Sequence, residues 1–265
     1  GRLTKQKKKI QQFPHENWKN EFQKAKRLKL NLIEWTIDHY GFYKNPLLNI
    51  KLKDSIKKIL IKNKIKINSV TADFFMEKPF WKQKNSSHYL KKIELLIKIC
   101  GLYKIKFIVL PLVDNSSIKN DYLENRVVFE LKKFQDLLKK KKVVILFESD
   151  FKPVKLLRFI KAFKNQNYAI NYDLGNSASL SYDIEKEFKL YGKFIKNIHI
   201  KDRLKMGKSV RLGNGNVDFD KFFILIRRMK YNGPLILQCA RSTKKGEDFN
   251  ELNINLKLIK KFLNN

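Results

Sequence analysis

Runs rich in Ile, Val, Leu and Phe alternate along the chain with longer segments in which apolar residues recur at helical spacing. Short apolar runs are typical of buried strands, and long amphipathic segments are typical of helices that pack against them. We therefore predict repeated strand–helix units around a parallel sheet. The predicted strands cover residues 30–35, 66–72, 105–111, 143–148, 168–173, 195–201 and 234–238. The predicted helices cover residues 16–29, 51–63, 88–103, 122–140, 153–164, 183–192, 218–230 and 250–263.

This alternation predicts an α/β fold, a (β/α)8 TIM barrel that lacks one strand at its start. Gly1-Arg2-Leu3 is our favoured candidate for the tail of a first strand truncated at the N-terminus, and Ile10-Gln-Gln-Phe13 is the alternative. The linkers are short and no composition shift marks a boundary, so we expect a single domain over residues 1–265.

Four consecutive predicted strands carry, at or within two residues of their ends, a residue that can bind a metal ion, namely Glu148, Asp173, His199 and Gln238. The ends of parallel strands meet at the mouth of a barrel, where such folds keep their chemistry. Two carboxylates, an imidazole and an amide oxygen suit one Mn²⁺, Mg²⁺, Co²⁺ or Zn²⁺ ion, with positions left for a substrate. The alternative is that these are ordinary polar residues at strand ends.

Arginines follow the last two predicted strands. Arg203, Arg211 and Arg241 lie in loops that often hold a phosphate in barrels, and a guanidinium offers that group two donors. Gly213 and Gly215 allow backbone amides to approach an anion, or they only form a turn before the next helix.

Earlier strands also end in acidic residues. Glu34, Asp73 and Asp114 are candidates to bind sugar hydroxyls, and capping of helices is the equal alternative.

The chain is strongly basic, with 58 Lys and Arg against 25 Asp and Glu and a net charge of +33. Such a charge usually indicates a polyanionic partner. Only nine of the basic residues are Arg, however, and Lys recurs on nearly every predicted helix. We interpret this as a drift toward Lys, Asn and Ile codons, the alternative being attraction of phosphorylated substrates.

The number of cysteines and the lengths of the apolar runs indicate the cellular compartment of the protein. Cys100 and Cys239 are too few for a disulfide framework, and no apolar run approaches the roughly 18 residues that span a bilayer. We expect a cytoplasmic protein with no membrane partner.

Several motifs together resemble the sugar phosphate isomerase/epimerase family of the xylose isomerase-like barrels. They are Leu32-Ile-Glu34-Trp35, Asp173-Leu-Gly-Asn176, His199-Ile-Lys-Asp202-Arg203, Leu212-Gly-Asn-Gly215, Val217-Asp-Phe219 and Ile236-Leu-Gln-Cys-Ala-Arg241. The likeness runs along the whole chain and is most specific over residues 168–241.

The resemblance implies metal binding by Glu148, Asp173 and His199, and a proton-transfer role for Glu148. Gln238 departs from the pattern of the epimerase branch, in which a second Glu stands at this position and exchanges protons from the opposite face of the substrate. An amide can bind a metal but cannot act as a base near neutral pH. Asn176 likewise stands where a second His often lies, and we expect it to contact substrate.

We therefore expect a metal-dependent isomerase or epimerase that acts on a small sugar or sugar phosphate through an enediolate. Glu148 would remove the proton, and Lys201 or a water would return it. The alternatives are an inosose-type dehydratase or lyase and a degenerate sugar-binding barrel. A barrel AP endonuclease is disfavoured because that group gathers three zinc ions with several His, and this chain has four His in all. We expect no specific nucleic acid partner, and a homo-oligomer stays open.

Overall fold

The computed structural model describes residues 3–4, 12–242, 244 and 246–264. The chain divides into two compact units. The first comprises Gly1–Lys29, Asp150–Leu157 and Asn171–Asn265, and the second comprises Leu30–Ser149 and Arg158–Ile170. A single domain over residues 1–265 stays a prediction.

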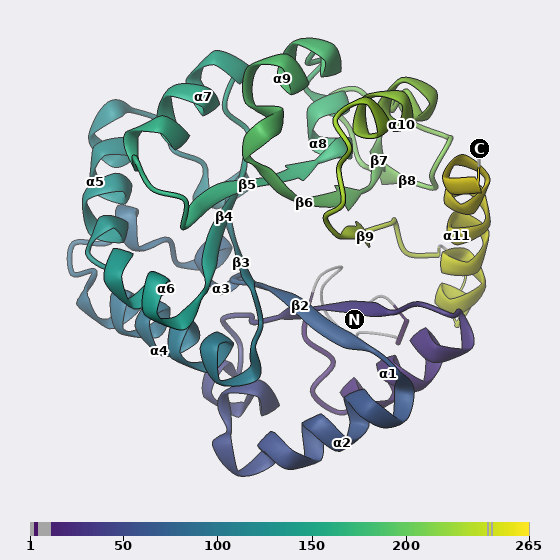
Figure 1. Ribbon diagram of the computed structural model, residues 1–265, viewed down its shortest axis with the longest axis horizontal. Helices are drawn as coiled ribbons and strands as arrows, with labels where there is room; N and C mark the ends of the chain where they lie inside the picture. Colours follow the sequence, from purple (N-terminus) through teal and green to yellow (C-terminus); the bar gives the residue numbers. More distant parts are fainter. Residues whose placement is uncertain (1–2, 5–11, 243, 245, 265) are drawn as a thin grey trace. The chain divides into compact units, whose positions relative to one another are not determined.

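In the described part of the chain, seven strands form one sheet in the order β1-β2-β3-β4-β5-β6-β9 (Figure 1). These strands are β1 (Leu32–Thr36), β2 (Lys66–Thr71), β3 (Phe107–Leu112), β4 (Val144–Ser149), β5 (Tyr168–Asp173), β6 (Ile195–Ile200) and β9 (Leu235–Leu237). Their parallel pairing and the helices between them confirm the predicted TIM barrel, and each predicted strand lies within two residues of its expected bounds.

The second unit is built on β1–β4. All residues of β3 are buried, whereas Trp35 is the one fully buried residue of β1. Phe107, Val109, Leu146 and Ala169 pack together as one inner cluster. The α-helices of this unit are α2 (Lys53–Asn63), α3 (Phe74–Glu77), α4 (Ser87–Tyr103), α5 (Asp121–Lys132) and α6 (Gln135–Lys141). Its 3₁₀ turns are η1 (Phe42–Lys44), η2 (Pro46–Leu48), η3 (Ile50–Leu52), η4 (Phe80–Lys82) and η5 (Asp114–Ser116). Helix α7 (Pro153–Ala162) begins in the first unit and ends in the second.

The first unit carries β6, β9 and the C-terminal helices. Helix α10 buries an aromatic face, and its Phe223 stacks on Phe262 with ring centroids 5.0 Å apart. The elements are α1 (Trp18–Arg27), α8 (Leu174–Ser179), α9 (Ile184–Tyr191), η6 (Gly192–Phe194), α10 (Phe219–Arg228), α11 (Asp248–Asn264) and a small antiparallel pair, β7 (Asp202–Arg203) with β8 (Ser209–Val210).

The structure differs from the predicted elements in a few places. The predicted helix 122–140 is two helices, α5 and α6, because the chain turns where the Phe134 N–H bonds to the Leu131 carbonyl. The short elements α3, α8, β7 and β8 have no counterpart among the predictions.

The predicted first strand falls largely outside the described residues, since Gly1, Arg2 and residues 5–11 are not among them. Leu3 is described and is not in a strand; its backbone N–H donates to the Glu21 carboxylate at 3.2 Å. Among the described helices, none combines the length and the apolar character needed to cross a membrane.

Candidate metal and substrate site

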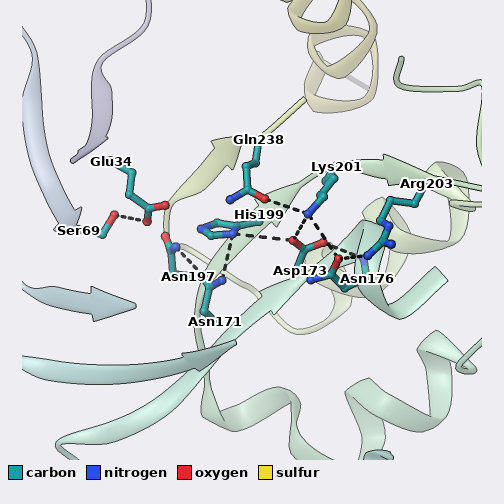
Figure 2. A network of polar contacts seen from close by, with 10 residues as sticks. All are labelled: Glu34, Ser69, Asn171, Asp173, Asn176, Asn197, His199, Lys201, Arg203 and Gln238. Carbon is teal, nitrogen blue, oxygen red and sulfur yellow. Dashed lines mark hydrogen bonds and ion pairs between the residues drawn. The ribbon is translucent and has the colours of Figure 1, made fainter. Parts of the chain in front are cut away.

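The ends of β5 and β6 bring an acid and an imidazole together within the first unit. Asp173 and His199 are both buried, and Asp173 Oδ2 lies 4.0 Å from His199 Nδ1 (Figure 2). Residues two apart on a strand share a face, so Asn171 and Asn197 point to the same side one layer earlier. The strand ends therefore form a layered, polar site.

The two amides of that earlier layer hold the imidazole. Asn197 Nδ2 donates to Asn171 Oδ1 at 2.6 Å, and Asn171 Nδ2 lies 3.2 Å from His199 Nδ1 (Figure 2). All three side chains are buried. Polar partners of this kind fix the orientation of a histidine that binds a metal.

Lys201 is the cation of this site. Its Nζ donates to Asp173 Oδ2 at 3.1 Å, to Gln238 Oε1 at 3.2 Å and to Asn176 Oδ1 at 3.4 Å. Because an ammonium has three hydrogens, these three oxygens use all of its donors. The amino group is thereby held beside the Asp173 carboxylate.

Asn176 links this lysine to an arginine. Arg203 Nη1 donates to Asn176 Oδ1 at 2.8 Å, and Arg203 Nε and Nη2 donate to the Gly207 carbonyl at 3.0 and 2.8 Å. The predicted substrate residues Asn176 and Arg203 therefore lie in the same network as Asp173 and Lys201 (Figure 2).

Glu148 occupies the corresponding place on β4. It is buried and lies one position past Phe147, which pairs with Ile170 of β5. Within the first unit, Asp173 and His199 offer a buried carboxylate and a buried imidazole to a metal ion, and their joining with Glu148 of the second unit in one site stays a prediction. Carboxylate oxygen and imidazole nitrogen suit the divalent cations expected from the sequence, so the donor set fits such an ion.

The glycine loop after β8 binds an anion of the chain itself. The N–H groups of Gly213 and Gly215 each donate to Asp202 Oδ2 at 2.9 Å, and that of Val217 donates to Asp202 Oδ1 at 3.1 Å. A Cβ on Gly215 would lie 2.1 Å from Asp202 Oδ1, which explains why glycine stands there. These amides serve an internal carboxylate, which disfavours their expected role toward a phosphate.

The other two predicted phosphate arginines meet carboxylates of α11. Arg211 Nε and Nη2 donate to the two oxygens of Glu251 at 2.8 and 2.6 Å, and Arg241 Nη1 lies 3.4 Å from Asp248 Oδ2. The hydrogen bonds from Arg211 lower the pKa of Glu251, and the same bonds raise the pKa of Arg211. Contact of Arg211 and Arg241 with substrate stays a prediction.

The three acidic candidates of the earlier strands lie in the second unit and differ from one another. Glu34 Oε2 accepts a hydrogen bond from the Ser69 hydroxyl at 2.6 Å, and Asp73 is buried at the start of α3. Asp114 is exposed in a turn and has a left-handed backbone with φ 51°. A role for these residues in binding sugar hydroxyls stays a prediction.

Comparison with known proteins identifies the family. The model of the xylose isomerase-like TIM barrel family matches residues 22–260. The chain belongs to this family. No protein among the curated ones matches the chain.

Three solved structures illustrate the relationship of this family member to others. A xylose isomerase domain protein from Planctomyces limnophilus has 17% identity over 91% of this chain and 90% of its own, with a TM-score of 0.75. The IOLI protein with a bound zinc atom has 15% identity over 93% and 94%, with a TM-score of 0.75. The 3-keto-D-glucoside 4-epimerase YcjR from E. coli has 16% identity over 94% and 95%, with a TM-score of 0.70. At these identities the likeness is one of fold.

Sequence reasoning missed several polar residues that build the site of this family member. Asn171 and Asn197 share the core-facing parity of the ligand candidates, so their place on the strands was visible although their bonds were not. Asp202 directly follows His199-Ile-Lys201 and was read as part of a motif without a role. Only the structure shows that it binds the glycine loop.

Proposed function

We propose that this xylose isomerase-like barrel is a metal-dependent isomerase or epimerase that converts a small sugar or sugar phosphate through an enediolate. The observation that carries the proposal is the buried pair of Asp173 and His199, with the Lys201 ammonium 3.1 Å from Asp173. A neighbour with a bound zinc atom and a neighbour that is a sugar epimerase support the class of reaction.

Different residues of the chain would bind the metal ion, remove the proton and return it. Glu148, Asp173 and His199 would hold the ion, which when bound would act as a Lewis acid toward the carbonyl and hydroxyl oxygens of a substrate. Glu148 would remove the proton next to the carbonyl. Lys201, held by three oxygens, would exchange its longest hydrogen bond, the one to Asn176 at 3.4 Å, for the enediolate and return a proton to it.

Gln238 takes part without acting as a base. Its Oε1 accepts from Lys201 at 3.2 Å, and an amide oxygen has a second lone pair that can reach a metal ion. We infer that Gln238 is a weak fourth ligand that also orients Lys201. In this way the lysine supplies the acid that a second Glu would supply in the epimerase pattern.

Asn176 and Arg203 are the substrate contacts that the network favours. Arg203 has guanidinium donors beyond those that bind Asn176 and Gly207, and a sugar hydroxyl or phosphate oxygen can accept them. A dehydratase of the inosose type would begin with the same proton removal. The four His of the chain are few for a site that gathers three zinc ions, which favours a single-ion enzyme over such a nuclease.

The test is exchange of substrate protons with D2O, measured by NMR over a panel of sugars and sugar phosphates with added Mn²⁺, Mg²⁺, Co²⁺ or Zn²⁺. We expect exchange with the wild type and none with Glu148→Gln. Lys201→Met serves as the matched variant. Because it keeps Glu148 as the base, it should still incorporate deuterium into the substrate while it forms little product. Full exchange by Glu148→Gln with metal bound would overturn the assignment of the base.

A further inference from the structure

A buried carboxylate on α9 receives three hydroxyl groups of the first unit. Glu187 is 2% exposed and accepts hydrogen bonds from Tyr172, Ser177 and Tyr191. Among the described residues, no Lys, Arg or His forms an ion pair with it. Burial raises the pKa of Glu187, although the three hydroxyl donors favour its charged form. A carboxylate buried without a cation costs stability, so its retention calls for a reason.

The two oxygens of this carboxylate hold different parts of the chain. Oε2 accepts from Tyr172 at 2.8 Å and also from Ser177, which lies on α8. Oε1 accepts from Tyr191, which lies one turn further along α9 itself. Oε2 therefore accepts hydrogen bonds from both ends of the segment 172–177, whereas Oε1 accepts one from a residue of the same helix.

The tied segment carries the residues of the candidate site. Asp173 follows Tyr172 directly, and Asn176 precedes Ser177. Asp173 Oδ1 accepts the Asn176 N–H at 2.8 Å as the cap of α8, which leaves Oδ2 to face His199 and Lys201. Moving either end of this short segment would rotate the carboxylate that faces the metal position.

We propose that Glu187 is a positioning residue: by binding Tyr172 and Ser177 through one oxygen, it clamps the segment 172–177 and fixes the direction of the Asp173 carboxylate. This inference rests on the proposed metal-binding role of Asp173. The clamp acts through geometry, since the hydrogen bonds printed for Glu187 go to Tyr172, Ser177 and Tyr191, which are not proposed ligands.

The test compares three variants that each remove one hydroxyl from the same carboxylate. Tyr172→Phe and Ser177→Ala each cut one tie to the segment, whereas Tyr191→Phe cuts only the bond within α9 and is the matched control. We expect the first two to weaken Zn²⁺ and Co²⁺ binding about tenfold, at the lower end of the effect of outer partners on metal affinity. Both should also change the visible absorption of bound Co²⁺, while Tyr191→Phe should leave affinity and spectrum within about twofold of wild type.

A purely structural role predicts a different pattern. If all three variants lower the melting temperature but leave metal affinity and the Co²⁺ spectrum alone, or if Tyr191→Phe changes them as much as the others, the clamp is refuted. If the wild type binds no metal, the proposed function is refuted and the clamp needs a separate test. The clamp is then judged by hydrogen exchange of the Asn176 amide, which must be faster in Tyr172→Phe and Ser177→Ala than in Tyr191→Phe.

Discussion

Asp173 performs two tasks through its two oxygens. Oδ1 caps α8 by accepting the Asn176 N–H, and Oδ2 faces the Lys201 ammonium and the His199 ring. A single residue thus couples the start of a helix to the chemistry at the strand end. The sequence placed Asp173 at the end of an apolar run, which was sufficient to select it as a ligand candidate. Its capping bond depends on the turn that follows, which no periodicity reveals.

The role of the Gln238 amide can be tested with a single substitution. Gln238→Ala removes one of three acceptors of Lys201 and, on our proposal, a weak metal ligand. We expect Mn²⁺ affinity to fall by roughly tenfold, because ligands and their partners contribute on this order, while proton exchange persists at saturating metal. Calorimetric titration with Mn²⁺ and NMR exchange measure the two effects. Loss of all exchange at full metal occupancy would give Gln238 a direct catalytic role instead.

Strands were the most predictable elements, and short helices the least. Buried parallel strands appear as compact apolar runs, such as Tyr168–Asp173, whose bounds were predicted without error. Helix α8 (Leu174–Ser179) has no amphipathic period in its small residues and exists because Asp173 caps it. The pair β7–β8 has two residues per strand, too few to show alternation. Individual hydrogen bonds, rather than an apolar pattern, determine such elements.

Several helices are followed by a lysine whose left-handed backbone conformation costs free energy, and the Lys-rich composition explains why lysine stands there. Lys104, which follows the last residue of α4, has a left-handed backbone with φ 58°, a position where glycine is usually found. The side chains of L-residues are disfavoured there by roughly 1–2 kcal/mol. The chain repeats this choice at Lys29, Lys64, Lys142, Lys164 and Lys230. Lysine at so many glycine-type positions supports the interpretation that the Lys excess is compositional.

A stability measurement tests this reading of the helix ends. Lys104→Gly should raise the free energy of unfolding by about 1 kcal/mol, because glycine adopts the left-handed backbone without a Cβ penalty. Lys98→Gly in the interior of the same helix is the matched control and should lower that free energy by about 1 kcal/mol. Urea denaturation followed by circular dichroism gives both values. A loss of stability with Lys104→Gly would contradict the argument.

At the scale of the whole molecule, the net charge of +33 is the most conspicuous property of the chain. If the Lys excess is compositional, the charge attracts nucleic acid without a site that reads or cleaves it. We expect duplex DNA to bind weakly, with affinity falling steeply as salt rises, in the manner of phosphate-only contacts. Fluorescence anisotropy over a salt series measures this. Cleavage of abasic DNA at physiological salt would instead favour the nuclease alternative.

We propose above that Glu148, Asp173 and His199 hold one divalent ion. Metal content of the purified protein, measured by inductively coupled plasma mass spectrometry after loading with Mn²⁺, Co²⁺ or Zn²⁺ and removal of excess, tests it most directly. We predict one ion per chain in the wild type and almost none in the His199→Ala and Asp173→Asn variants. No ion in the folded wild type, three ions per chain, or full occupancy in both variants would refute the proposed metal site.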